Sequence, residues 1–159
     1  MPVIDFTTVI HAPVERVFDL ARSVELHAAS TARTGERAVA GVISGLLGPG
    51  QQVTWRGKHF GLWLRLTSRI TAYDRPHHFR DSMVRGAFRR FDHDHYFEPV
   101  GGGGTEMRMR DVFDFTSPWG TLGAIADRLF LIRYMQTLLL RRSLAIKEAA
   151  ETDRWAAYL

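Results

Sequence analysis

The sequence predicts an α+β fold in which a curved, seven-stranded antiparallel sheet is covered by two short helices and one long C-terminal helix. The main observation is a hydrophobic pattern with the two-residue period of β-strands, which runs from Gly35 to Thr116. The segments on both sides of this region contain stretches with the 3.6-residue period of helices. A length of 159 residues fits a single domain, 1–159.

The N-terminal region predicts one strand followed by two helices. Val3–His11 is the strand, and Pro13 suits the first position of a helix, where its missing N–H costs nothing. Helical spacing continues to about Arg22, and Ser23 is placed to cap a second helix over Val24–Ser30. The side chains that share one face of the strand are Ile4, Phe6, Thr8 and Ile10.

Six further strands are predicted in the region of two-residue periodicity. Glycine, proline or aspartate separates most of them, which is typical of the turns in an antiparallel sheet. Ten residues of strand span about 33 Å, and a sheet of such long strands tends to curl around whatever covers it. The predicted strands are Glu36–Ser44, Gln52–Phe60, Leu62–Tyr73, His77–Arg85, Arg89–Glu98 and Thr105–Thr116.

The covering element is predicted to be a long helix over Trp119–Glu151, with Ser117 as its cap and Pro118 as its first residue. Its apolar side changes partway along, so we expect either a kink near Arg133 or different partners for the two halves. The first half presents Leu122, Ile125, Ala126, Leu129 and Ile132. The second half presents Met135, Leu138, Leu139, Ile146 and Ala149 on the opposite side.

The order of these elements resembles the helix-grip fold of the START-like (SRPBCC) superfamily, which includes birch-pollen-allergen-like and polyketide cyclase/dehydrase-like proteins. Ile10–Phe18 is similar to the opening strand, Ala-Pro step and helix of that superfamily, and Gly104-Thr105 and Ser117–Gly120 are similar to its late landmarks. The resemblance covers essentially the whole chain. It implies a cavity between sheet and long helix that holds a lipid, sterol, aromatic metabolite or polyketide, with or without a reaction.

Strand alternation places ionisable groups among aromatic and methionine side chains on the inward face of the sheet. An unpaired buried charge costs several kcal/mol, so we expect His93 and His95 to pair with Asp81 and Asp111. Arg142 lies within the second apolar arc of the long helix and is expected to reach a carboxylate of the sheet or to anchor an anion. Trp55 and Trp63 are interpreted either as core residues or as residues that line the cavity. The residues predicted to bind a ligand are Trp55, His59, Leu66, Phe79, Asp81, Met83, Phe91, His93, His95, Phe97, Met109, Asp111, Phe113, Leu122, Ile125, Leu129, Met135 and Arg142.

The grouping of His93 or His95 with Asp111 has three interpretations. It is a polar network that fixes the sheet register, a general acid/base pair, or an anchor for a polar group of the ligand. His93, His95 and Asp111 are therefore the candidate catalytic residues. Two histidines and one carboxylate also fit a metal site. Such residues often share a strand face by chance, however, so we expect neither metal nor cofactor.

Composition and charge exclude several functions. The net charge is 21 minus 17, or +4, without a basic tract, so no nucleic-acid partner is expected. The absence of cysteine excludes disulfides and cysteine nucleophiles and fits a cytoplasmic location. The sequence shows no signal segment, and its apolar runs are all much shorter than the roughly 20 residues that span a membrane. No integral membrane association is therefore expected.

The function expected first is binding of a hydrophobic small molecule. A cyclase or dehydratase that uses histidine and aspartate in the same cavity is the main alternative. A protein-interaction or lipid-carrier module is the third, and a homodimer stays open.

Overall fold

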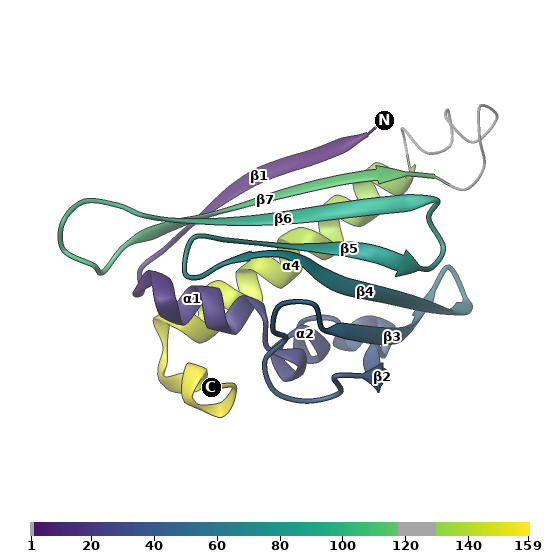
Figure 1. Cartoon of the computed structure of the whole chain (residues 1–159), viewed down its shortest axis with the longest axis horizontal. Coiled ribbons are helices and arrows are strands. Elements are labelled where there is room, and N and C mark those ends of the chain that lie inside the picture. The colour runs from purple at the N-terminus through teal and green to yellow at the C-terminus, as the bar shows by residue number, and fades with distance from the viewer. Residues whose placement is uncertain (1, 118–129) are drawn as a thin grey trace.

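A computed structural model describes residues 2–117 and 130–159 (Figure 1). Within these residues one antiparallel sheet contains seven strands in the order β1-β7-β6-β5-β4-β3-β2, which confirms the predicted fold class. Only β1 lies out of chain order, because it pairs with β7. The strands are β1 Val3–Ile10, β2 Arg37–Gly41, β3 Gln52–His59, β4 Leu62–Asp74, β5 His78–Arg85, β6 Arg90–Pro99 and β7 Met107–Thr116.

The described α-helices agree with the prediction in type, and α2 has the predicted bounds, whereas α1 begins one residue later than predicted. Ser23 caps α2 as predicted, because its hydroxyl accepts a hydrogen bond from the Leu26 N–H at 3.3 Å. Pro13 has an extended ψ of 140° and therefore precedes the first turn of α1 instead of forming it. The two short 3-10 helices were not predicted. The helical segments are α1 Val14–Ala21, α2 Val24–Ser30, η1 Ala32–Thr34, α4 Ile132–Glu151 and η3 Asp153–Ala157.

The first part of the predicted long helix, including Leu122, Ile125 and Leu129, lies outside the described residues. The described helix α4 begins at Ile132, next to the position where a kink was expected. None of the helices in the described part of the chain has the length and apolar character that crossing a membrane requires.

Strand β2 is shorter than predicted because the backbone turns at Gly41. This residue has a φ of 73°, and a Cβ atom there would lie 2.3 Å from the carbonyl oxygen of Gln52. The register of β2 also shifts between Ala38 and Ala40. The alternating pattern continues to Ser44, but the strand ends at Gly41.

One end of the space between α4 and the sheet is filled. Helix α4 runs obliquely across one face of the sheet, and α1 lies beside its C-terminal part (Figure 1). Phe18 of α1 makes edge-on ring contacts with Phe79 and Phe97, with ring centres 5.5 and 5.1 Å apart. We call this region the packed end. Its buried core includes Ile10, Val17, Phe18, Leu20, Phe79, Phe97, Met107, Met109 and Ile146.

A second, smaller core lies at the other end of the sheet and contains Phe91, Phe113, Phe115 and Leu139. The strand register places ionisable residues between the two cores. Asp81 of β5 pairs with His93 of β6, and His95 of β6 pairs with Asp111 of β7. These four residues therefore lie at the border between the two ends of the interface.

Candidate functional site

A cavity of about 1130 Å³ lies between the sheet and the segment from Phe130 to Arg142, which includes the first half of α4. We call this region the hollow end. Ligand pockets commonly measure about 300–1,000 Å³, so this space exceeds the usual range. Of the residues predicted to bind a ligand, the cavity is lined by Trp55, His59, Leu66, Asp81, Phe91, His93, Phe113, Met135 and Arg142. Trp55 is the tryptophan on the wall, whereas Trp63 is half exposed beneath the Arg56 guanidinium.

Six predicted residues do not line this cavity: Phe79, Met83, His95, Phe97, Met109 and Asp111. Phe79, Phe97 and Met109 belong to the packed end, and Met83 packs against the smaller core. His95 and Asp111 are almost fully buried, with 1% and 3% of their surface exposed. Strand alternation identifies the inward face but not which stretch of that face a helix fills, so it did not separate these six residues from those on the wall of the large cavity.

His93, His95, Asp81 and Asp111 form one contact group, which we call the inner cluster. His93 Nε2 and His95 Nε2 lie 3.2 Å from Asp111 Oδ1 and Asp81 Oδ1, respectively. His95 Nδ1 approaches Asp111 Oδ1 to 2.7 Å at an angle unsuited to a hydrogen bond, so we treat this contact as charge attraction. Ser143 of α4 donates to Asp111 Oδ2 at 3.1 Å. The histidines therefore contact the aspartates as predicted.

Burial and charge set different protonation states within the inner cluster. Burial would raise the pKa of Asp81, but the His95 hydrogen bond and the neighbouring positive charges lower it to about 2. The histidine contacts likewise hold the pKa of Asp111 well below its usual range, against the effect of burial. Burial and the charge of His95 lower the pKa of His93, whereas the two carboxylates raise that of His95 despite its burial. The group is best described as a charged His95 between two carboxylates, with a neutral His93.

These contacts limit the chemistry of the inner cluster. Both nitrogens of His93 face carboxylates, because its Nδ1 lies 3.8 Å from Asp81 Oδ1. Both nitrogens of His95 also face carboxylates. A general base needs a lone pair directed at the substrate, which neither ring offers to the cavity in this arrangement.

Asp81, His93 and His95 also meet a geometric condition for holding a metal ion. One potential ligand atom from each lies within 4.8 Å of the others. These residue types would suit a transition metal. An ion would compete with the contacts that the same atoms make within the inner cluster.

A second polar group, which we call the tyrosine cluster, contains His27, Glu36, His59 and Tyr134. The Tyr134 hydroxyl lies 2.7 Å from His59 Nδ1, and His59 Nε2 lies 3.5 Å from Glu36 Oε2. Glu36 Oε1 lies 2.6 Å from His27 Nε2. All four residues line the cavity, but only His59 was predicted.

The missed residues come from elements whose periodicity does not reveal them. His27 lies on the short helix α2, Glu36 lies between η1 and β2, and Tyr134 lies on α4. Gly57, inside β3, was the available signal, because a glycine within a strand often marks close approach of another group. A Cβ atom on Gly57 would lie 3.1 Å from His59 Nε2 and 3.2 Å from Glu36 Cβ.

The tyrosine cluster surrounds a single negative charge. Burial would raise the pKa of Glu36, but its contacts with His27 and His59 hold it well below the usual range. Burial lowers the pKa of His27, whose ring also stacks on Trp55 with centres 3.8 Å apart. Burial and the charge of Glu36 raise the pKa of the Tyr134 hydroxyl, which therefore keeps its proton.

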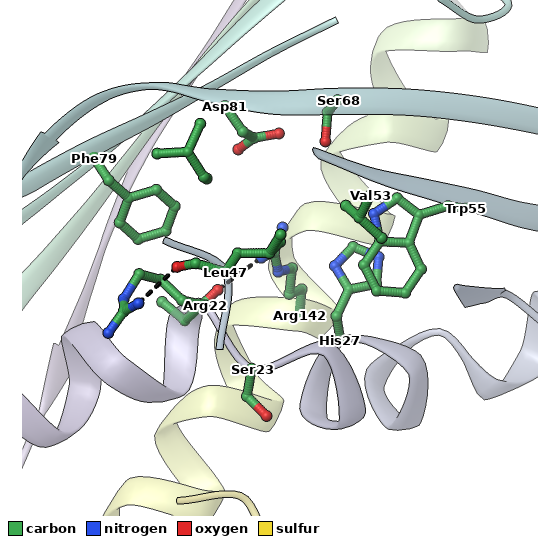
Figure 2. Close-up of a pocket in the computed structure, with 12 residues that line it drawn as sticks. Arg22, Ser23, His27, Leu47, Val53, Trp55, Ser68, Phe79, Asp81 and Arg142 are labelled. Carbon is green, nitrogen blue, oxygen red and sulfur yellow. Dashed lines mark hydrogen bonds between the residues drawn. The ribbon is translucent and has the colours of Figure 1, made fainter. Parts of the chain in front are cut away.

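A polar recess of about 30 Å³ adjoins the large cavity, with room for about one water molecule. Figure 2 shows Asp81 and Ser68 projecting from the sheet, with His27 and Arg142 projecting from the helices. These four residues and Trp55 line both spaces, so the recess continues the large cavity inward.

Arg142 does not reach a carboxylate as we had expected. Its Nη2 donates to the carbonyl oxygen of Ala21 at 2.9 Å, and no carboxylate of the described residues forms a salt bridge with it. Ala21 is the last residue of α1, where carbonyl groups lack partners within the helix and attract cations. Asp81 of the sheet lines the same recess as Arg142, but it already contacts both histidines of the inner cluster.

The chain matches a family model described as polyketide cyclase / dehydrase and lipid transport over residues 1–151. No curated protein matches the chain in sequence.

Solved structures share this fold at low sequence identity. The protein TTHA0849 of Thermus thermophilus is 19% identical, with a TM-score of 0.74 over 94% of this chain and 97% of its own. A START superfamily protein of Mycobacterium smegmatis is 12% identical, with a TM-score of 0.68 over 94% and 97% of the two chains. The di-domain ARO/CYC protein BexL of the BE-7585A biosynthetic pathway is 14% identical, with a TM-score of 0.65 over 93% of this chain and 46% of its own. At these identities the likeness establishes the fold alone.

Proposed function

Because the chain belongs to the polyketide cyclase/dehydrase and lipid transport family and has the helix-grip fold of the START-like superfamily, we propose that it binds a hydrophobic small molecule between sheet and α4. The observation that carries this proposal is the cavity of about 1130 Å³. Its wall includes many side chains with no hydrogen-bonding group, such as Leu64, Leu66, Phe88, Phe91, Phe113 and Leu138.

The physical argument concerns the water that would otherwise fill this space. At about 30 Å³ per molecule, a space of 1130 Å³ corresponds to roughly 40 waters. Water beside a leucine or phenylalanine side chain finds few partners there, so an apolar molecule that replaces it gains free energy. We propose that the predicted residues on the wall, Trp55, His59, Leu66, Asp81, Phe91, His93, Phe113, Met135 and Arg142, contact this molecule.

The test compares two leucines of α4 that differ in position. Leu138 lines the cavity, whereas Leu140 is 48% exposed and does not. Titration with the fluorescent probe N-phenyl-1-naphthylamine should show saturable binding to the native protein. Leu138→Trp should weaken this binding at least about tenfold by filling the space, a loss of about 1.4 kcal/mol. Leu140→Trp should leave it unchanged. Absence of saturable binding, or an equal effect of both variants, would overturn the proposal.

A cyclase or dehydratase reaction in the same cavity is a second candidate, favoured by the description of the matched family. The contacts of the inner cluster argue against His93 and His95 as its acid/base residues, because their nitrogens face carboxylates. Incubating the native protein with a ligand that it binds distinguishes catalysis from binding alone. Release of a product that has lost water would favour the enzyme, and recovery of the unchanged ligand favours binding alone.

We also propose that the protein is cytoplasmic and acts without a nucleic-acid partner. The sequence contains no cysteine, and its net charge is only +4. Cell fractionation measures the location directly.

A further inference from the structure

We propose that the ligand carries a hydroxyl group or a comparable hydrogen-bond donor. The Tyr134 oxygen accepts this hydrogen bond, because the chain of contacts Tyr134–His59–Glu36–His27 commits the Tyr134 proton to His59. The inference rests on the proposed function, since it requires a ligand in the cavity.

The tyrosine cluster is built from four separate parts of the chain. α4 supplies Tyr134, the end of β3 supplies His59, the segment before β2 supplies Glu36, and α2 supplies His27. All four side chains line the same cavity. Gly57 lets Glu36 and His59 approach each other, because a Cβ atom there would lie within 3.2 Å of both. Helices and sheet therefore converge on one polar spot in a mostly apolar wall.

The protons in this chain have a definite direction. Glu36 is ionised and accepts only, so the imidazole nitrogens that face it are donors. His27 Nε2 lies 2.6 Å from one carboxylate oxygen, and His59 Nε2 lies 3.5 Å from the other. From this geometry we assign the His59 tautomer with its proton on Nε2 and its lone pair on Nδ1.

This assignment fixes what Tyr134 presents to a ligand. The Tyr134 hydroxyl lies 2.7 Å from His59 Nδ1 and donates its only proton to that lone pair. Its oxygen keeps acceptor capacity but has no hydrogen left to give. A ligand group beside it must therefore donate, as an alcohol, phenol or N–H group does. An ether or ketone oxygen would face another oxygen with no proton between them.

The size of this preference follows from the net contribution of one neutral hydrogen bond, which corresponds to about 5- to 10-fold in affinity. A site built around a hydroxyl also leaves its own polar group unpaired when an analogue lacks that donor. Tyr134 should therefore affect the choice between a donor and its methylated analogue more than the affinity for apolar molecules.

The experiment uses the full chain and two probes of similar shape, 1-naphthol and 1-methoxynaphthalene. The native protein should bind 1-naphthol about 5- to 10-fold more tightly, although 1-methoxynaphthalene is the more apolar molecule. Tyr134→Phe should abolish this preference and change the affinity for 1-methoxynaphthalene less than about twofold. Tyr73→Phe is the control, because Tyr73 packs on Phe18 at the packed end. This variant should preserve the preference.

The outcomes separate this inference from the proposed function. If both probes bind saturably with equal affinity, the inference is overturned and the proposed function stands. A preference for 1-naphthol that survives in a folded Tyr134→Phe protein also overturns it, and circular dichroism checks the fold. If neither probe binds the native protein, the proposed function fails and the inference fails with it.

Discussion

The packed end and the hollow end of the interface between α4 and the sheet have similar inward faces but different fillings. Both ends present phenylalanines, Phe79 and Phe97 at one and Phe91 and Phe113 at the other. At the packed end, Phe18 of α1 fills the space between sheet and helix. At the hollow end, a cavity of about 1130 Å³ remains between the described residues. The sheet pattern alone therefore does not determine whether an inward side chain becomes core or cavity wall.

The largest expected effect comes from removing a matched aromatic ring at each end. Phe18→Ala should lower the free energy of unfolding by about 4 kcal/mol, because a fully buried ring leaves an empty space among close-packed neighbours. Phe88→Ala should lower it by only about 1–2 kcal/mol, because Phe88 is partly exposed and already borders the cavity. Urea unfolding measures both values. Equal losses would contradict the distinction between the two ends.

The second prediction concerns the border between the ends, where Asp81 contacts both histidines. The pKa of Asp81 falls from 3.8 to about 2 on folding, so the unfolded chain binds this proton more readily. The resulting stability is present above pH 3.8 and is lost as the pH falls through about 2, a change of roughly 2 kcal/mol. Unfolding of the native protein and of Asp81→Asn is measured from pH 5 downward. The difference between them should shrink towards pH 2, and a constant difference would count against the assignment.

The smallest predicted effect sharpens the description of the hollow end. Gly57→Ala should destabilise the protein by about 1 kcal/mol, because the new methyl group would crowd Glu36 and His59. Gly102→Ala is the control, since a Cβ atom at this loop position meets nothing within 4 Å. Thermal unfolding compares the two variants. If Gly57→Ala were as stable as Gly102→Ala, the tyrosine cluster would be less tightly held than its distances indicate.

Sequence periodicity was sufficient to predict the architecture and half of the polar interior. Alternation placed His93, His95, Asp81 and Asp111 on the inward face, and the rule against unpaired buried charge predicted their contacts. These inferences succeed because a strand has a fixed two-residue period.

The other half of the site depends on contacts between elements that no local pattern encodes. Glu36 precedes a short strand and contacts His27 on helix α2, and Tyr134 of α4 lies 75 residues from its partner His59. Likewise, the alternation in β6 treats Phe91 and Phe97 alike. The position of α1 covers Phe97 at the packed end, whereas Phe91 belongs to the smaller core and also lies on the cavity wall.

The pairing of β1 with β7 determines when the sheet can be completed as the protein is synthesised. Val3 pairs with Asp114 and Ile10 with Met107, so the first strand to leave the ribosome waits for the last. Until then its backbone donors and acceptors, and those along the free side of β6, have no strand to pair with. A nascent chain halted before Met107 would therefore leave both β1 and the free side of β6 unpaired, and each offers backbone groups that another chain can pair with.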